Sequence, residues 1–373
     1  MGSASHAGAL VAWSGFVLAF IFGAVANRTN FCTMGAVSDV VNMGSWGRMR
    51  MWLLAIAIAI VGAQALQMLG LVDLGKSFYV RPNVTWLSYA VGGFLFGVGM
   101  TLGSGCGSKT LIRLGGGSLK SLVVFIFLGI AAYMTLKGLF AIWRVAWIDP
   151  VATNLASVNV PRQDLPTLIA SFTGTNLRVV EPVVALAVAA ALLAFVFKDR
   201  DFRSSFDHVL GGLVVGLVIV GGWYVTGHLG FGESAETLEE VFVGTNSRTI
   251  ESFSFVAPVG YALELLMLWS DKSLTVTFGV AAVVGVVLGS FAYAIASRTF
   301  RWEGFAGAED TANHVLGGVL MGFGGVTALG CTIGQGVTGF STLALGSILA
   351  FASIVAGAAL TMKWQYWRIS RES

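Results

Sequence analysis

Three cysteines are the residues of this chain whose chemistry and spacing point most directly to a function. Two of them end matching segments: residues 92–106 read GGFLFGVGMTLGSGC and residues 317–331 read GGVLMGFGGVTALGC. Five glycines and the final cysteine of the first segment recur 225 positions later, without a gap. The third, Cys32, ends a weaker copy within FIFGAVANRTNFCTMGA at residues 20–36. Because a thiol is soft, polarisable and a weak hydrogen-bond donor, a row of thiols suits a soft, sulfur-bearing solute better than a hard oxyanion.

Other chemical roles fit these cysteines less well. Their odd number gives no disulfide framework, and the sequence has no CxxC or mixed Cys/His spacing, so we expect no metal and no cofactor. A membrane cysteine is ordinarily a small buried hydrophobic residue, but a shared position after a helix-breaking segment favours a common function. A redox enzyme carrying a persulfide would need a reactive thiol. No catalytic base, haem site or nucleotide site accompanies the cysteines, so we do not expect an enzyme.

The composition sets the class of protein that must position these thiols. Of 373 residues, 56% are hydrophobic and 11% are charged, against about 25% charged in an ordinary soluble domain. Such a chain has too little polar surface to cover a water-soluble globule. A disordered chain, a secreted disulfide scaffold and a nucleic-acid-binding domain are equally poor fits. The apolar runs are also too long for outer-membrane strands, so the sequence predicts an all-α polytopic membrane protein.

Nine segments reach the length of about 20 apolar residues that a helix needs to cross a bilayer. They lie near 9–27, 51–72, 87–105, 119–140, 180–197, 209–225, 274–296, 315–330 and 343–362. A tenth segment, 255–269, is shorter and contains Pro258 and Glu264, so we expect a partial or interfacial helix there. Lysines and arginines gather after the first, third, fifth, seventh and ninth spans. The positive-inside rule then puts the N-terminus in the periplasm and the C-terminus in the cytoplasm.

This topology makes the repeat an inverted one, because spans 3 and 8 would cross in opposite directions. A fourth copy, beginning His208-Val-Leu-Gly-Gly in span 6, pairs with span 1 and has no cysteine. We expect a single transmembrane transporter domain over residues 1–373, with repeat halves 1–178 and 206–373 linked by a helix at 179–198. Inverted repeats are a common build of membrane transporters, with the binding site at the repeat interface.

Five further residues are candidates for the substrate pathway beside the cysteines. Gly105 and Gly330 belong to glycine clusters that would cost about 1 kcal/mol per residue inside a helix, so they predict helix breaks. Arg28 would either attract an anion or extend to the membrane interface. Lys109 would serve the anion or belong only to the cytoplasmic basic cluster, and Gln335 would hydrogen-bond the solute.

The phrase Asn-Arg-Thr-Asn-Phe-Cys-Thr-Met-Gly-Ala at residues 27–36, with the two glycine-rich segments that end in cysteine, resembles the YeeE/YedE family of sulfur-transport membrane proteins. The resemblance covers nearly the whole chain. It implies an hourglass of nine spanning helices plus short half-helices, and uptake of thiosulfate across the bacterial inner membrane. It also implies that Cys32, Cys106 and Cys331 pass the anion along through S–H···S hydrogen bonds.

The expected partners are a small sulfur-containing anion and the lipid bilayer, and no nucleic acid. The resemblance leaves room for a cytoplasmic sulfur-carrier or signalling partner. Two alternatives to thiosulfate uptake stay open: a membrane sensor or scaffold for sulfur compounds, and a transporter of another sulfur or selenium species. A sensor would bind its ligand saturably without flux into liposomes.

Overall fold

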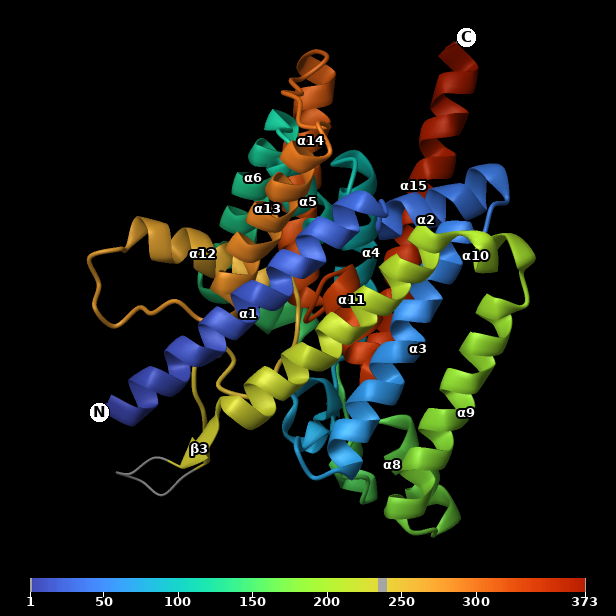
Figure 1. Ribbon diagram of the computed structural model, residues 1–373, viewed down its shortest axis with the longest axis vertical. Helices are drawn as coiled ribbons and strands as arrows, with labels where there is room; N and C mark the ends of the chain where they lie inside the picture. Colours follow the sequence, from blue (N-terminus) through green and yellow to red (C-terminus); the bar gives the residue numbers. More distant parts are fainter. Residues whose placement is uncertain (1, 234–239, 373) are drawn as a thin grey trace.

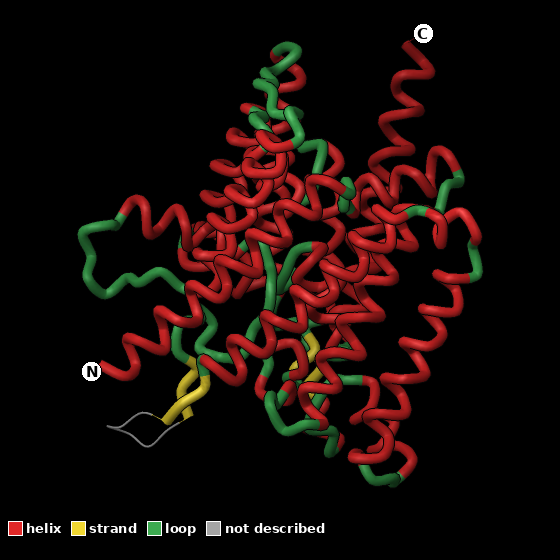
Figure 2. Tube along the Cα trace, in the orientation of Figure 1, coloured by secondary structure: helices red, strands yellow, loops and turns green. Residues whose placement is uncertain are grey.

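The computed structural model describes residues 2–233 and 240–372, and this part of the chain is mainly helical with almost no sheet (Figure 1, Figure 2). Eight helices of the described chain are long and apolar enough to cross a membrane, so the protein has an all-α, multi-pass membrane fold. They contain α1 (Gly2–Arg28), α3 (Gly47–Met68), α4 (Trp86–Leu102), α6 (Leu119–Lys137), α9 (Leu177–Phe197), α11 (Phe206–Tyr224), α13 (Phe278–Ala296) and α15 (Leu345–Glu372). A further long helix, α14 (Ala308–Thr327), is less apolar.

Eight of the nine predicted spans coincide with these apolar helices. The remaining one, 315–330, lies in α14, whose first turn carries Glu309 and Asp310. Because α14 packs between α4 and α6, it is enclosed by protein and needs less apolar surface than a span facing lipid. The segment 255–269 forms α12 (Ala257–Met267), an 11-residue helix of about 17 Å that is too short to cross the bilayer core, as predicted.

Short elements interrupt or connect the long helices. The short α-helices are α2 (Thr33–Ser38), α5 (Gly107–Gly115), α7 (Leu139–Trp143), α8 (Leu165–Thr173) and α10 (Arg200–Ser204). Single π-helical turns occupy Asp39–Met43, Arg144–Ile148, Val225–Leu229 and Gly334–Gly339, and 3-10 turns occupy Leu74–Lys76, Phe78–Val80 and Leu155–Val158. Two antiparallel ribbons pair β1 (Asn83–Val84) with β2 (Thr153–Asn154) and β3 (Phe231–Glu233) with β4 (Glu240–Phe242). Residues 234–239, between β3 and β4, lie outside the described residues.

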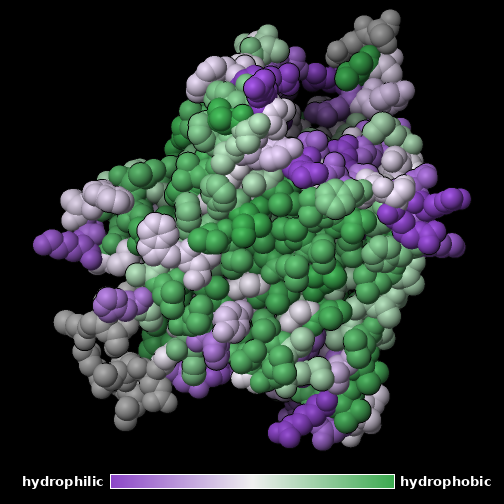
Figure 3. Space-filling view, in the orientation of Figure 1, coloured by the Kyte–Doolittle hydropathy of each residue, from purple (hydrophilic) through white to green (hydrophobic). Residues whose placement is uncertain are grey.

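The surface is typical of a protein that lies in lipid. Figure 3 shows a broad hydrophobic face across the middle of the molecule, with hydrophilic residues gathered toward its upper and lower ends. Large apolar side chains such as Trp13, Leu186 and Leu360 are more than half exposed. The two ends of the chain lie on opposite sides of the molecule (Figure 1).

The strongest helix contacts join the first half of the sequence to the second half. α1 packs along α13 and α11 along α3, while α15 packs along α4 and α14 along α6. When the helices of the first half are matched in order with those of the second, α1 corresponds to α11, α3 to α13, α4 to α14 and α6 to α15. Exchanging the two halves then turns the contact of α1 with α13 into the contact of α11 with α3. It likewise turns the contact of α4 with α15 into the contact of α14 with α6.

Glycines let α4 and α14 meet backbone to backbone at the centre. A side chain added at Gly324 would place its Cβ 2.6 Å from the carbonyl oxygen of Gly92, and one added at Gly317 would approach the carbonyl oxygen of Gly99 to 2.7 Å. Gly92 and Gly317 are matched repeat positions, as are Gly99 and Gly324. The two contacts therefore exchange when the repeat copies are exchanged, as in a two-fold symmetric interface.

Candidate functional site

The same backbone pattern precedes each cysteine. Two residues before it, the chain takes a left-handed conformation, at Asn30 (φ 51°), Ser104 (φ 57°) and Leu329 (φ 58°). The N–H of the next residue bonds to a carbonyl five residues earlier, as from Gly105 to Met100 at 2.9 Å. This pattern closes the preceding helix and redirects the chain. The predicted helix breaks are therefore present, after α1, α4 and α14.

Each cysteine then begins a new helical turn. Cys32 is the N-cap of α2 and Cys106 is the N-cap of α5, while the carbonyl of Cys331 accepts the N–H of Gln335 at 2.7 Å. The N–H of Gly35 lies 3.4 Å from the Cys32 sulfur, so the thiol takes the place of the usual Ser, Thr or Asp oxygen at a helix start. These helix starts present partly positive N–H groups beside the sulfur atoms.

The three breaks bring their thiols into one buried region of the protein. Cys32 and Cys106 lie close enough for each to act on the protonation of the other. The Ser108 hydroxyl lies 3.3 Å from the Cys106 sulfur. Thr332, the neighbour of Cys331, lies near the same sulfur, and its hydroxyl has no hydrogen-bond partner among the described residues. All three cysteines are buried and none forms a disulfide. We call Cys32, Cys106 and Cys331 the cysteine cluster.

A fourth unwound segment, residues 251–256, contacts the cluster without a cysteine. The N–H of Phe255 donates to the Cys331 sulfur at 3.3 Å, and the Ser254 hydroxyl lies 3.9 Å from it. The Thr338 hydroxyl holds the segment by donating to the carbonyl of Phe253 at 2.8 Å. This segment follows the fourth repeat copy along the chain.

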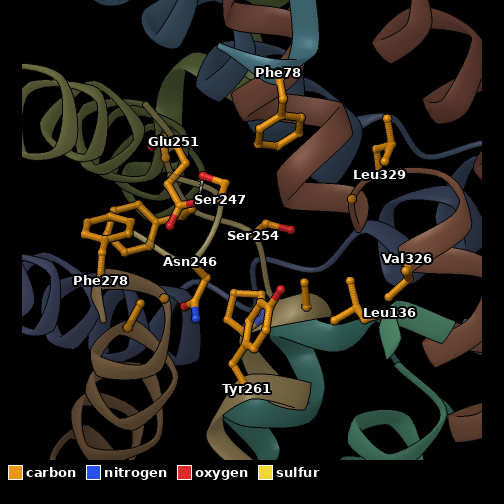
Figure 4. A pocket seen from close by; sticks show the side chains of 18 of the residues that line it. Phe78, Leu136, Asn246, Ser247, Glu251, Ser254, Tyr261, Phe278, Val326 and Leu329 are labelled. Carbon is orange, nitrogen blue, oxygen red and sulfur yellow. Dashed lines mark hydrogen bonds between the residues drawn. The ribbon is translucent and has the colours of Figure 1, made fainter. Parts of the chain in front are cut away.

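One cavity approaches the cluster through the break before Cys331. It has a volume of about 210 Å³, its lining includes Ser254, Leu329 and Gly330, and we call it the Glu251 cavity (Figure 4). At about 30 Å³ per molecule of liquid water, it has room for roughly seven waters. It therefore accommodates a small anion together with part of its hydration shell.

A second cavity approaches from the other side. It has a volume of about 290 Å³, is lined by Asn30, Lys109 and Arg113, and is called the Lys109 cavity here. Ser118, the N-cap of α6, lines the Lys109 cavity, whereas Leu136 near the end of α6 lines the Glu251 cavity. Since α6 has 19 residues and is about 28 Å long, the two cavities lie at opposite ends of this helix.

Of the two charged residues predicted for the pathway, Lys109 is the one that lies near the thiols. Its ammonium lies 3.4 Å from the Asn30 amide oxygen, and its charge acts on both Cys32 and Cys106. Arg28 instead lies at the surface, where its guanidinium pairs with Asp207 at 3.1 Å. It lines a separate cavity of about 440 Å³.

The predicted glycines and glutamine lie at the breaks themselves. A Cβ added at Gly105 would lie 3.2 Å from the Lys109 side chain, and one at Gly330 would lie 3.1 Å from the Gln335 side chain. Gln335 is buried, and its amide nitrogen donates to the carbonyl of Ala328 at 2.5 Å, at the end of α14. Its amide oxygen has no hydrogen-bond partner among the described residues.

Sequence reasoning missed several residues that the structure places here. Thr33, Ser108 and Thr332 follow the cysteines by one or two positions and are buried. Their recurrence was visible in the sequence. Phe255 carried no such signal, because its contact uses the backbone. Within the described residues, no group of His, Cys, Asp and Glu is arranged to hold a metal ion.

A multi-pass helical bundle with polar, interrupted helices and a cavity on either side of them is the architecture of a membrane transporter. A family model described as sulphur transport matches residues 28–360. The chain therefore belongs to the sulphur-transport family, and the resemblance seen in its sequence is confirmed. It is a transporter of sulfur compounds and not an enzyme.

Two curated relatives extend over most of the chain. One is a thiosulfate transporter named TsuA from Spirochaeta thermophila, 27% identical over 360 residues that cover 95% of this chain and 99% of the relative. The other is the thiosulfate transporter TsuA of Escherichia coli K12, 28% identical over 344 residues that cover 87% of this chain and 86% of the relative.

Proposed function

We propose that the protein takes up thiosulfate, which passes from the Glu251 cavity through the cysteine cluster to the Lys109 cavity. The observation that carries this proposal is the meeting of three thiols, from distant helix breaks, between cavities at opposite ends of α6. Thiosulfate has one soft terminal sulfur and three hard oxygens. Thiols suit the sulfur, and the nearby hydroxyl and backbone N–H groups suit the oxygens. Such single neutral contacts are weak enough to release the anion again.

The inner membrane, with the N-terminus in the periplasm and the C-terminus in the cytoplasm, is the location we propose. Ion pairs support this orientation by joining separate basic clusters on one side of the molecule. Arg113 pairs with Glu303 at 3.2 Å and Lys120 with Asp310 at 2.8 Å. Positive charge concentrated on one side favours a cytoplasmic location for that side.

An inverted repeat of residues 1–178 and 206–373, linked through α9, would explain the helix packing. The exchanged contacts of α1 with α13 and of α11 with α3 support it, as do the exchanged glycine contacts of α4 with α14. In such transporters the binding site lies where the repeats meet. A cytoplasmic sulfur-carrier or signalling partner stays a prediction.

Uptake into proteoliposomes tests the proposed function directly. The purified full-length protein is expected to admit labelled thiosulfate saturably, with weaker competition from sulfate, which lacks a soft terminal sulfur. Sulfite and a selenium analogue in the same assay distinguish the sulfur and selenium alternatives. Saturable binding without flux would instead support the sensor alternative and contradict uptake.

Lys109→Gln is expected to lower thiosulfate uptake about fivefold and to weaken its dependence on salt. The reason is that Lys109 supplies positive charge beside two of the thiols, and the attraction between an ammonium and an anion is screened by salt. Initial rates at low and high ionic strength check this. Lys363→Gln removes the same charge from an exposed position on α15 and should leave the rate within about twofold. Equal effects of both variants would contradict a role for Lys109.

A further inference from the structure

The Glu251 cavity contains one carboxyl group on the route to the thiols. Glu251 begins the unwound segment whose later residues, Ser254 and Phe255, contact Cys331. Figure 4 shows Glu251, Ser254 and Tyr261 around the same cavity, with the Glu251 carboxylate beside the Ser247 hydroxyl. An anion moving toward Cys331 along this wall of the cavity would pass Glu251.

The rest of the lining offers hydrogen-bond donors without charge. They come from several segments around the cavity, and they are Tyr79, Asn246, Ser247, Ser252, Ser254 and Tyr261. The described lining holds no lysine or arginine. A lining of neutral donors suits a small anion, but a carboxylate among them repels it, and this repulsion is strong in a half-buried cavity.

No cation in the described surroundings neutralises Glu251. Lys137 of α6 forms an ion pair with Glu264 of α12 at 3.1 Å, so these two charges neutralise each other. Arg248, on the same loop as Glu251, is exposed. The remaining titratable groups near the cavity are neutral tyrosines, Tyr79 and Tyr261, whose phenols interact with Glu251.

Hydrogen bonds and burial act on Glu251 in opposite directions. The Ser247 hydroxyl donates to its carboxylate at 2.6 Å and favours the charged form. Burial favours the neutral form more strongly and raises the pKa of Glu251 to about 7. The carboxyl group is therefore neutral below about pH 7 and charged above it.

We propose that the Glu251 cavity is the first binding site of the transported anion, and that Glu251 admits the anion only in its protonated form. The neutral carboxyl group donates a hydrogen bond to the anion, whereas the carboxylate repels it. This inference rests on the proposed function. It adds a proton-dependent step at a site separate from the cysteine cluster.

Initial thiosulfate uptake in right-side-out membrane vesicles tests the proposal, with internal pH fixed and external pH varied between about 6 and 8. Thiosulfate stays a dianion in this range, so its own charge does not change. The wild-type rate is expected to fall about tenfold across the range, following the neutral fraction of one group titrating near 7. Glu251→Gln keeps a neutral donor at every pH, so its rate should stay near the wild-type rate at pH 6 throughout.

Two further variants sharpen the test. Ser247→Ala removes a donor that favours the charged form, so the midpoint of the wild-type curve should move to higher pH. This variant carries the test if Glu251→Gln does not fold. Glu240→Gln removes an exposed carboxylate of β4 that pairs with Lys76 and should retain the wild-type curve.

The outcomes separate this inference from the proposed function. Wild-type uptake that does not change with pH, a Glu251→Gln variant that keeps the wild-type slope, or a folded Glu251→Gln variant without uptake would each overturn the role of Glu251. Each of the first two results leaves thiosulfate uptake itself intact. Absence of wild-type uptake at every pH would refute the proposed function, and this inference with it.

Discussion

Cys106→Ala is expected to lower thiosulfate uptake by roughly ten- to a hundredfold. Cys106 is the central member of the cysteine cluster. It lies near the thiol of Cys32, the Ser108 hydroxyl and Thr332. A hydrogen bond to a charged group contributes about 1.5–3 kcal/mol, and each 1.4 kcal/mol changes a rate about tenfold. Losing the central thiol therefore removes one such contact from the proposed route of the anion.

The measurement is the initial rate of uptake at equal amounts of folded protein in the membrane. Ser121→Ala is the matched control, because it also removes one polar atom from a buried side chain, on α6. It should change the rate less than about twofold. Wild-type uptake by a folded Cys106→Ala variant would show that the cluster lies off the route of the anion.

Gly324→Ala is expected to destabilise the protein by about 3 kcal/mol, and by more if α4 and α14 have to separate. The added Cβ would lie 2.6 Å from both the Gly92 carbonyl oxygen and the Phe96 backbone nitrogen. Backbone atoms cannot turn away as the end of a flexible side chain does, so the helices must shift. Overpacking of a rigid contact typically costs 1–3 kcal/mol.

Thermal unfolding in detergent, together with the fraction of monodisperse protein, measures this loss. Gly304→Ala serves as the control, since nothing lies within 4 Å of a Cβ added there. It should unfold at the wild-type temperature. A Gly324→Ala variant as stable as wild type would mean that α4 and α14 do not meet closely in the membrane.

Most of the fold was predictable because its signals are long. Runs of apolar residues predicted the spans, and the short segment with Pro258 and Glu264 predicted the partial helix α12. The span at α14 was harder to judge from hydropathy, since its charged first turn lies on a helix that protein, not lipid, surrounds.

The breaks were predicted in place but not in conformation. Glycine clusters predicted helix breaks around Gly105 and Gly330, but they did not indicate that the left-handed residues are the neighbours Ser104 and Leu329. The glycines are needed for space, because the side chains of Lys109 and Gln335 lie over them. The sequence shows where a glycine lies, but not whether the fold needs its backbone freedom or the space left by its missing side chain.

The contact of Phe255 with Cys331 could not be predicted at all. It is made by a backbone N–H, which every residue except proline carries, so no residue type marks it. The pairing of Lys137 with Glu264, which leaves Glu251 without a counter-ion, likewise depends on three segments that only the folded chain brings near one another.

The fourth unwound segment, residues 251–256, carries no thiol, so the proposed route has two chemically different ends. A solute arriving from the Glu251 cavity would meet one sulfur atom, Cys331, already surrounded by the N–H donors of Phe255 and Gly334. One arriving from the Lys109 cavity would meet a pair of sulfur atoms, Cys32 and Cys106, with a cation beside them. Binding at the two ends therefore has unequal strength, and forward and backward flux should saturate at different concentrations.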